Sequence, residues 1–215
     1  NIEAIYEKKK LSEDDLEKLI LQIKEKKIDG VNITIPFKKK IISYIDELTL
    51  EAESTQSVNT IYLKNDKLIG HNTDIDGFKI SVEKSKFNLT DKKVLILGAG
   101  GVVPSLIFAL NKMKVSKIIV SNRTQKKTGN LKNLFRGIEV VDWGVIPNID
   151  MIINATSLGL NKDDKFDLDF SELKNKFFYD VIYNPKETNF LKEGKKLGNT
   201  GENGKMMFIY QAQAA

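Results

Sequence analysis

The chain has 215 residues and carries 34 Lys and Arg against 29 Asp and Glu, which gives a net charge of +5. This length allows one large domain or two smaller ones. The lysines are scattered, so a nucleic acid is not an expected partner. No apolar run approaches the ~18 residues of a membrane helix, so a membrane is not expected either. Because the chain has no cysteine, a disulfide framework and a cysteine-based zinc site are excluded, no metal site is predicted, and a cytoplasmic location is expected.

Residues 1–86 are predicted to form a small α/β unit. A strand is expected over 2–6, followed by a helix that Ser12 caps and whose first turn carries acidic side chains. One face of this helix is expected to be buried, because apolar residues recur at helical spacing until Asp29-Gly30 ends it: Leu16, Leu19, Ile20 and Ile23. The remaining elements are a strand over 31–35, a short helix over 38–45, a hairpin of strands 58–63 and 67–69 around Asn65-Asp66, and a helix from Thr73 or Asp74 to about Lys86.

Residues 87–204 are predicted to form a doubly wound parallel sheet of the Rossmann type. The continuous apolar run 94–97 is typical of a parallel strand that is buried on both faces, and a helical stretch follows it to about Lys112. Further strands are expected over 117–120, 138–141, 151–153 and 177–181, and their alternation with other segments favours a parallel sheet. The tail over 206–215 is predicted to be one helix that packs back on the first unit. The fold class is therefore α/β with two domains.

A glycine-rich turn, Gly98-Ala99-Gly100-Gly101, separates the first strand of this sheet from its helix. Gly98 permits a tight turn, Gly100 lets the backbone approach a phosphate, and the helix N-terminus offers N–H donors. The usual third glycine or alanine position is occupied by Val103. An ordinary strand-to-helix turn is the alternative, but the strand before the turn and the helix after it favour dinucleotide binding.

The second strand of the sheet bears on which dinucleotide is bound. It ends in Ser121-Asn122-Arg123-Thr124, with Lys126 and Lys127 close behind, and no acidic residue is present to bind a ribose 2′-hydroxyl. Arg123 can bind a 2′-phosphate in bidentate fashion, so NADP is the predicted cofactor, against the alternative of a solvated basic loop. Thr156 follows a later strand, where it either lines the nicotinamide ribose or caps a helix, and both interpretations stay open.

Lys38 is the strongest candidate for acid–base chemistry on a substrate hydroxyl. It follows a strand that ends in Pro36, so a rigid element positions this lysine. A cation there also stabilises a developing alkoxide, and Asp74 is a candidate partner. Sequence spacing does not place Lys38 near Asp74, and a lysine within Lys38-Lys39-Lys40 is also typical of a solvated face. The single histidine, His71, is interpreted as structural or exposed.

Several of these segments, taken together and in order, resemble the motifs of the shikimate dehydrogenase family. The resemblance runs along nearly the whole chain through these segments: Val31-Asn32-Ile33-Thr34-Ile35-Pro36-Phe37-Lys38, Val58-Asn59-Thr60, Asn72-Thr73-Asp74 with Gly77, Gly98-Ala99-Gly100-Gly101, Ser121-Asn122-Arg123-Thr124, Asn154-Ala155-Thr156, Tyr183-Asn184-Pro185 and Gln211-Ala212. It implies the reversible, NADPH-dependent reduction of 3-dehydroshikimate to shikimate in the chorismate route to the aromatic amino acids.

The resemblance also implies roles for individual residues. Lys38 would act as acid and base toward the substrate oxygen, and Asp74 would hydrogen-bond the adjacent hydroxyls. The implied substrate-binding residues are Thr34, Asn59, Tyr183 and Gln211. Asn122, Arg123, Thr124 and Lys127 would hold the 2′-phosphate, and Gly204 and Met207 would lie near the nicotinamide. The substrate domain would comprise 1–86 and the C-terminal helix over 205–215, and 87–204 would bind NADP.

Two departures and three rival interpretations remain beside this resemblance. Family members carry an N-terminal Ser-x-Ser segment for the substrate carboxylate, and nothing like it precedes Lys8-Lys9-Lys10. The last helix of the family is also cut short at Ala215, so a chain truncated at both ends that binds substrate poorly is expected. The rivals are a quinate/shikimate dehydrogenase with broader substrate or NAD use, a non-catalytic NADP-binding regulator of the same fold, and another two-domain dehydrogenase, such as one acting on a folate or an amino acid. The sequence does not indicate an oligomeric state, and a homodimer is allowed.

Overall fold

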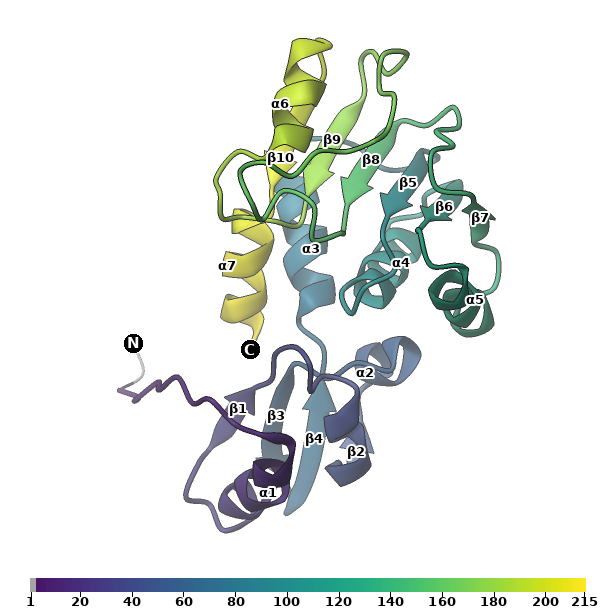
Figure 1. Cartoon of the computed structure of the whole chain (residues 1–215). Helices are drawn as coiled ribbons and strands as arrows, with labels where there is room; N and C mark the ends of the chain where they lie inside the picture. The colour runs from purple at the N-terminus through teal and green to yellow at the C-terminus, as the bar shows by residue number, and fades with distance from the viewer. Residues whose placement is uncertain (1–2) are drawn as a thin grey trace.

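The computed structural model describes residues 3–215, in which there are two β-sheets: the smaller packs on one hydrophobic core, and the larger has a core on each face. The smaller sheet lies at the bottom of Figure 1 and the larger one above it, and the chain passes from one to the other just before α3. Helix α7 returns beside α3, so that the C-terminus lies between the two sheets (Figure 1). Within the described residues, no helix combines the length and apolar character needed to cross a membrane.

The small unit is a four-stranded sheet in the order β1-β3-β4-β2, in which β2 is parallel to β4 and the other pairs are antiparallel. Its strands are β1 (Gly30–Asn32), β2 (Glu47–Leu48), β3 (Thr60–Lys64) and β4 (Lys67–His71). Its helical elements are η1 (Glu13–Asp15), α1 (Leu16–Lys24), η2 (Lys40–Tyr44) and α2 (Leu50–Thr55). The apolar face of α1 packs against the sheet, with Ile23, Ile61 and Leu68 completely buried.

Most of the elements expected in the small unit are present. Ser12 donates from its backbone N and its Oγ to Asp15 Oδ2 at 2.8 and 2.6 Å, so the predicted cap is formed. The hairpin turn is also present, because Asn65 and Asp66 both adopt the positive φ that such a turn requires. The short helix expected over 38–45 is a 3₁₀ turn, η2.

Three expectations for the small unit were wrong in extent or kind. Residues 3–12 form no strand, and the first residue of that predicted strand, at position 2, lies outside the described residues. The strand expected over 31–35 ends at Asn32, because pairing with β3 stops at Thr60. Helix α1 ends at Lys24, before the predicted stop, and the short elements β2 and α2 were not predicted.

The larger unit is a six-stranded parallel sheet in the order β10-β9-β8-β5-β6-β7. Its strands are β5 (Lys93–Leu97), β6 (Lys117–Ser121), β7 (Glu139–Val141), β8 (Met151–Asn154), β9 (Phe177–Asp180) and β10 (Thr200–Asn203). The helices are α3 (Asp74–Lys84), α4 (Val103–Lys112), α5 (Gln125–Leu134), α6 (Asn189–Lys196) and α7 (Lys205–Ala214). Five of the strands and α7 match the predicted segments within two residues, whereas β10 and α6 were not predicted.

Both faces of the larger sheet are covered, as a doubly wound fold requires. Val94 and Ile96 point into a core shared with α3, α4, α5 and α7, whereas Leu95 and Leu97 point into a second core shared with α6. This alternation explains why β5 is apolar at every position but its first. The predicted fold class is confirmed.

Candidate active site

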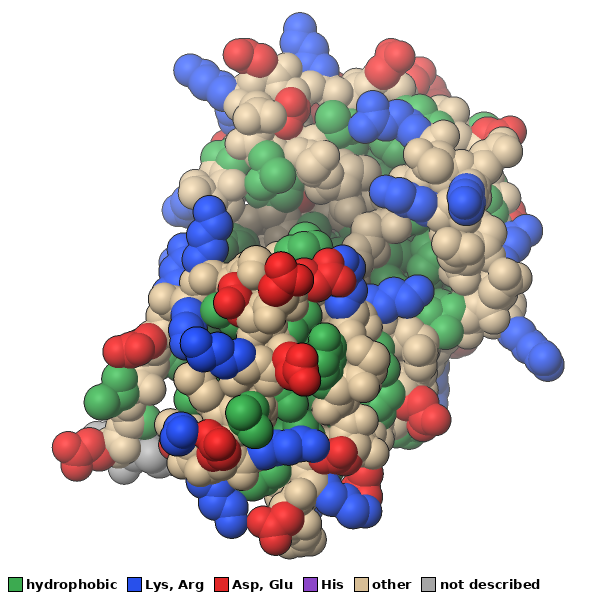
Figure 2. Space-filling view, turned by 60° about the horizontal axis from the view of Figure 1, so that its bottom comes forward, with side chains coloured by type: hydrophobic (Ala, Val, Ile, Leu, Met, Phe, Trp, Pro, Cys, Tyr) green, Lys and Arg blue, Asp and Glu red, His purple; other side chains and the backbone are tan. Residues whose placement is uncertain are grey.

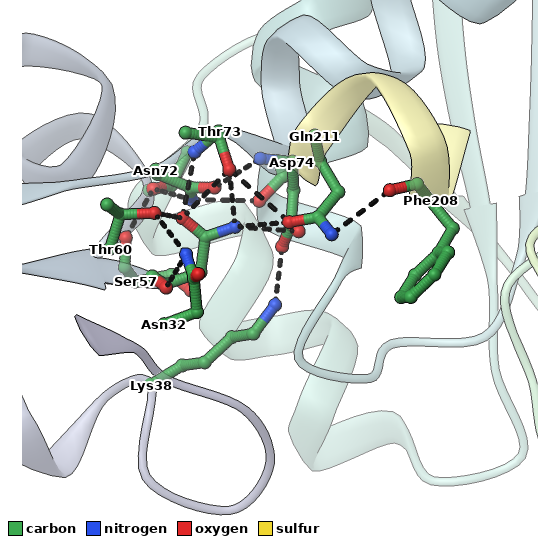
Figure 3. A network of polar contacts seen from close by, with 12 residues as sticks. Asn32, Lys38, Ser57, Thr60, Asn72, Thr73, Asp74, Phe208 and Gln211 are labelled. Carbon is green, nitrogen blue, oxygen red and sulfur yellow. Dashed lines mark hydrogen bonds and ion pairs between the residues drawn. The ribbon is translucent and has the colours of Figure 1, made fainter. Parts of the chain in front are cut away.

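The centre of the candidate site is an ion pair between Lys38 and Asp74, shown in Figure 3. Lys38 Nζ donates to Asp74 Oδ2 at 2.6 Å, and the two side chains are 19% and 9% exposed. Asp74 is the first residue of α3, and the backbone of Lys38 is held by a hydrogen bond from Val58 N to its carbonyl oxygen at 2.8 Å. The fold thus joins two residues that the sequence spacing left apart.

Asn59 fixes the orientation of the Asp74 carboxylate. Its Nδ2 donates to Asp74 Oδ1 at 3.0 Å and to Thr73 Oγ1 at 2.9 Å, and its Oδ1 accepts from Thr73 N at 2.9 Å. Asp74 Oδ2 accepts a hydrogen bond from Lys38, as Figure 3 shows, and Asp74 Oδ1 accepts one from Asn59. Both carboxylate oxygens therefore have defined partners.

Helix α7 brings Gln211 to this network from the far end of the chain. Gln211 Oε1 accepts from Asn59 Nδ2 and from Thr73 Oγ1, each at 3.4 Å, and its Nε2 donates to the carbonyl oxygen of Phe208 at 3.1 Å. This approach depends on Gly77, because a Cβ there would lie 2.6 Å from Met207 O and 2.8 Å from Gln211 Cβ. Glycine at position 77 therefore lets α7 pack closely on α3.

Most of the predicted cofactor-binding residues follow strands at one edge of the larger sheet. The strand registers pair Leu97 with Ser121 and Asn154, Asn154 with Asp180, and Asp180 with Asn203, so the carboxyl ends of five parallel strands are level. The strand order reverses at β5, with β6 on one side and β8 on the other, and ligands bind parallel sheets at such a point. The glycine-rich turn follows β5 directly.

The glycine-rich turn has space on the side where a phosphate would bind. Gly98 has φ of 108°, and a Cβ on it would lie 2.7 Å from Ala155 O, so this position requires glycine. By contrast, a Cβ on Gly101 would meet nothing within 4 Å, and one on Gly100 would meet only Ala155 O at 3.7 Å. Val103, at the usual third glycine position, is completely buried in the core, which accounts for that departure.

The end of β6 is positively charged and fits a 2′-phosphate. Arg123, Thr124 and Lys127 are exposed, and the guanidinium of Arg123 lies over the ring of Trp143, 5.8 Å from its centre. Asn122 Nδ2 donates to the carbonyl oxygen of Thr124 at 2.9 Å, which shapes the turn. Together with the open glycine turn, this donor set suits a phosphorylated dinucleotide.

A buried carboxylate holds the neighbouring strand ends together. Asp180 Oδ1 accepts from Asn154 Nδ2 and Ile182 N, each at 3.0 Å, and its Oδ2 accepts from Thr188 Oγ1 at 2.5 Å. Burial raises the pKa of Asp180 to about 6, although these three hydrogen bonds oppose the shift. Asn154 Oδ1 in turn accepts from Thr156 N and Oγ1, so Thr156 belongs to a polar turn and caps no helix.

The remaining predicted residues lie around these clusters. Thr34 is exposed, and Tyr183 is 48% exposed and stacks on Phe208 with ring centres 4.8 Å apart. Gly204 is the N-cap residue just before α7, where a Cβ would lie 2.1 Å from Val181 O, and Met207 is buried in the core. His71 is half-buried, with Nδ1 2.8 Å from Thr49 Oγ1, so its structural interpretation fits.

Figure 2 shows that the surface is recessed between the small unit in the foreground and the larger unit behind it. Acidic and basic side chains are interspersed on this face (Figure 2). In the part of the chain that the structure describes, no group of three or more His, Asp or Glu side chains is arranged to hold a metal ion.

Sequence reasoning missed several residues of these clusters. Asn72 and Thr73 stand beside Asp74 in one motif, yet only the fold shows what their side chains bind. Trp143 is the single tryptophan of the chain, and no local pattern connects it to Arg123. The same holds for Thr188, which reaches Asp180 from eight residues away.

The fold and the site together define a Rossmann-type oxidoreductase with a lysine–aspartate pair. Two protein-family models match the chain: the shikimate dehydrogenase substrate binding domain over residues 1–61, and shikimate / quinate 5-dehydrogenase over residues 81–180. The "Shikimate dehydrogenase (NADP(+))" of Pelagibacter ubique is 57% identical over 215 residues, which cover 100% of this chain and 81% of that protein. The chain belongs to the shikimate dehydrogenase family.

Solved structures agree with this membership. A shikimate dehydrogenase in complex with NADP+ is 34% identical with a TM-score of 0.87, and the match covers 94% of this chain and 74% of that one. The quinate dehydrogenase from Corynebacterium glutamicum in complex with NAD is 30% identical with a TM-score of 0.84, and the match covers 92% and 74%.

Proposed function

We propose that this chain catalyses the reversible reduction of 3-dehydroshikimate to shikimate with NADPH, in the chorismate route to the aromatic amino acids. The observation that carries the proposal is the pairing of Lys38 with Asp74 in a chain 57% identical to a shikimate dehydrogenase (NADP(+)). Arg123 and the absence of an acidic residue from 121–124 favour NADP over NAD.

Lys38 and Asp74 are the proposed catalytic pair. NADPH supplies the hydride when it is bound. As negative charge develops on the substrate carbonyl oxygen, Lys38 Nζ hydrogen-bonds that oxygen and donates a proton to it. Asp74 positions Lys38 and accepts a hydrogen bond from the adjacent hydroxyl of the substrate. In the oxidative direction, Lys38 takes the hydroxyl proton back.

The binding roles are assigned to the residues around this pair and at the sheet edge. Thr34, Asn59, Tyr183 and Gln211 are proposed to bind the substrate. Cofactor binding is proposed for the residues at the carboxyl edge of the larger sheet: Gly98, Ala99, Gly100, Gly101, Asn122, Arg123, Thr124, Lys127, Thr156, Gly204 and Met207. Two observations support this assignment: a Cβ on Gly101 would meet nothing within 4 Å, and Arg123 is exposed.

We also propose that 1–86 with 205–215 form the substrate domain and that 87–204 bind NADP. The separate sheets support this division, and α3 and α7, which are assigned to the substrate domain but pack in the core of the larger sheet, form the joint between the domains. A cytoplasmic location is proposed because NADPH is an intracellular cofactor. A homodimer stays a prediction that analytical ultracentrifugation would test.

Replacing Lys38 tests the catalytic role. Lys38→Ala is expected to lower kcat by about 10²–10⁴-fold, the usual contribution of a general acid–base group, while NADP+ affinity stays within about twofold. Lys39→Ala is the matched control, because it removes the same charge from an exposed neighbour. Unchanged turnover in Lys38→Ala would remove Lys38 from the mechanism.

The substrate and cofactor are tested by following the absorbance of reduced cofactor with shikimate or quinate, each with NADP+ and with NAD+. Fast reduction with shikimate and NADP+ only is the expected result. Activity with quinate and NAD+ would keep the fold and overturn the cofactor assignment. Binding of NADP+ without turnover of either substrate would instead favour a non-catalytic NADP-binding regulator.

A further inference from the structure

A buried amide connects the two units next to the catalytic pair. Asn72 lies in the two-residue link between β4 and α3, where the chain leaves the small unit. Its Nδ2 donates to Thr55 Oγ1 at 2.9 Å and to Ser105 Oγ at 3.0 Å, and its Oδ1 accepts from Asp74 N at 3.1 Å. The side chain is completely buried, so these three contacts satisfy it without solvent.

The three partners of Asn72 come from different parts of the molecule. Thr55 ends α2 of the small unit, and Ser105 lies in the first turn of α4, the helix that follows the glycine-rich turn. Both hydroxyl-bearing residues are at most 1% exposed. A continuous series of contacts therefore runs from α4 through Asn72 to Asp74. It continues from Asp74 Oδ2 to Lys38 Nζ, as Figure 3 shows.

We propose that Asn72 is a positioning residue that ties the small unit to α4, and so holds Asp74 and Lys38 at a fixed place relative to the glycine-rich turn. Two donor hydrogens and one acceptor on a planar amide define both distance and direction, which apolar packing at this junction would not do. The inference rests on the proposed function, because it concerns how that function's catalytic pair is placed against the cofactor edge.

Two variants each remove one of the hydrogen bonds that Asn72 Nδ2 donates. Ser105→Ala removes the acceptor on α4, and Thr55→Val removes the acceptor on α2 with little change in volume. Each is expected to lower kcat with shikimate by between about threefold and tenfold, the equivalent of one buried hydrogen bond. NADP+ affinity, measured through the fluorescence of the single tryptophan Trp143 beside Arg123, is expected to change less than about twofold.

Ser81→Ala is the matched control. Ser81 is also a buried serine, and its Oγ lies 3.0 Å from Tyr179 OH within the larger unit. This variant is expected to lower the melting temperature as Ser105→Ala does and to leave kcat unchanged. If Ser105→Ala and Thr55→Val lower only the melting temperature, as the control does, Asn72 is structural and the proposal is wrong.

Hydrogen exchange of the free protein gives a readout that needs no turnover. Backbone amides over 72–76 are expected to exchange at least about threefold faster in Ser105→Ala and Thr55→Val than in the native protein or in Ser81→Ala. Equal exchange rates of these amides in all four proteins would contradict the proposal that Asn72 positions Asp74. If the native protein has no activity with shikimate and NADP+, the proposed function fails, and the exchange result alone then decides on Asn72.

Discussion

Arg123 leaves the end of β6 with its guanidinium over the ring of Trp143, and no acidic side chain stands in its turn. If the Arg123 side chain binds the 2′-phosphate, removing it weakens the binding of NADP+ but not of NAD+, because NAD+ has no 2′-phosphate. Arg123→Ala is expected to weaken NADP+ binding by about 10- to 100-fold, the range for a charge-assisted hydrogen-bonded contact, and to leave NAD+ binding nearly unchanged. Titration of Trp143 fluorescence with both dinucleotides measures this difference.

Lys132→Ala is the control for general charge, because Lys132 is exposed at the opposite end of α5. It lowers the net charge by the same amount and is expected to change NADP+ affinity by less than about twofold, as screening is strong beyond a Debye length. Equal losses for both dinucleotides in Arg123→Ala would show that Arg123 does not discriminate between them.

At the scale of elements, Asp180 connects the ends of β8 and β9 with the segment that leads into α6. Its pKa is raised to about 6 by burial, so between pH 3.8 and about 6 the folded protein binds more protons at this site than the unfolded chain. The contribution of Asp180 to stability therefore falls as the pH rises through this window, by an amount on the order of 3 kcal/mol.

Asp180→Asn isolates this contribution. The amide can accept from Asn154 and Ile182 through Oδ1 and donate to Thr188 Oγ1 through Nδ2, so the network is retained without the charge. Urea unfolding is expected to give similar stabilities for the two proteins below pH 3.8 and a more stable variant above about pH 6. A constant difference at every pH would contradict the raised pKa.

At the scale of the whole molecule, the joint between the units depends on the close packing of α3 and α7 at Gly77. A Cβ at this position would lie 2.6 Å from Met207 O and would separate the two helices. Gly77→Ala is expected to reduce the free energy of unfolding by about 1–3 kcal/mol, as overpacking does, and to raise KM for shikimate because Gln211 is displaced from Asn59.

Gly129→Ala is the matched control in an exposed helix. A Cβ at Gly129 would meet nothing within 4 Å, so this variant is expected to raise the free energy of unfolding by about 0.5–1 kcal/mol through helix propensity. Urea unfolding and shikimate kinetics of both variants check the pair. A Gly77→Ala protein as stable as Gly129→Ala would show that α7 can move away from α3 at no cost.

Elements with a local cause could be predicted from the amino-acid sequence. The apolar run of β5, the Ser12 cap, the hairpin turn at Asn65-Asp66 and the glycine at position 98 each follow from side-chain burial or from φ restrictions within a few residues. The order of motifs along the chain also sufficed for the family. Short elements such as β2 and β10 escaped prediction, because strand pairing with distant segments defines them.

Which side chains contact one another depends on the folded structure and could not be predicted from the sequence. Lys38 and Asp74 are 36 positions apart, and Asn59 and Gln211 are 152 apart, and no periodicity encodes such contacts. The first contact forms because Val58 N holds the backbone of Lys38 beside the β3–β4 pair, which leads into α3, and the second forms because Gly77 lets α7 return along α3. Asn72 hydrogen-bonds Thr55 and Ser105 because the burial of two separate cores fixes where their surfaces join, and the polar groups at that junction must then find partners.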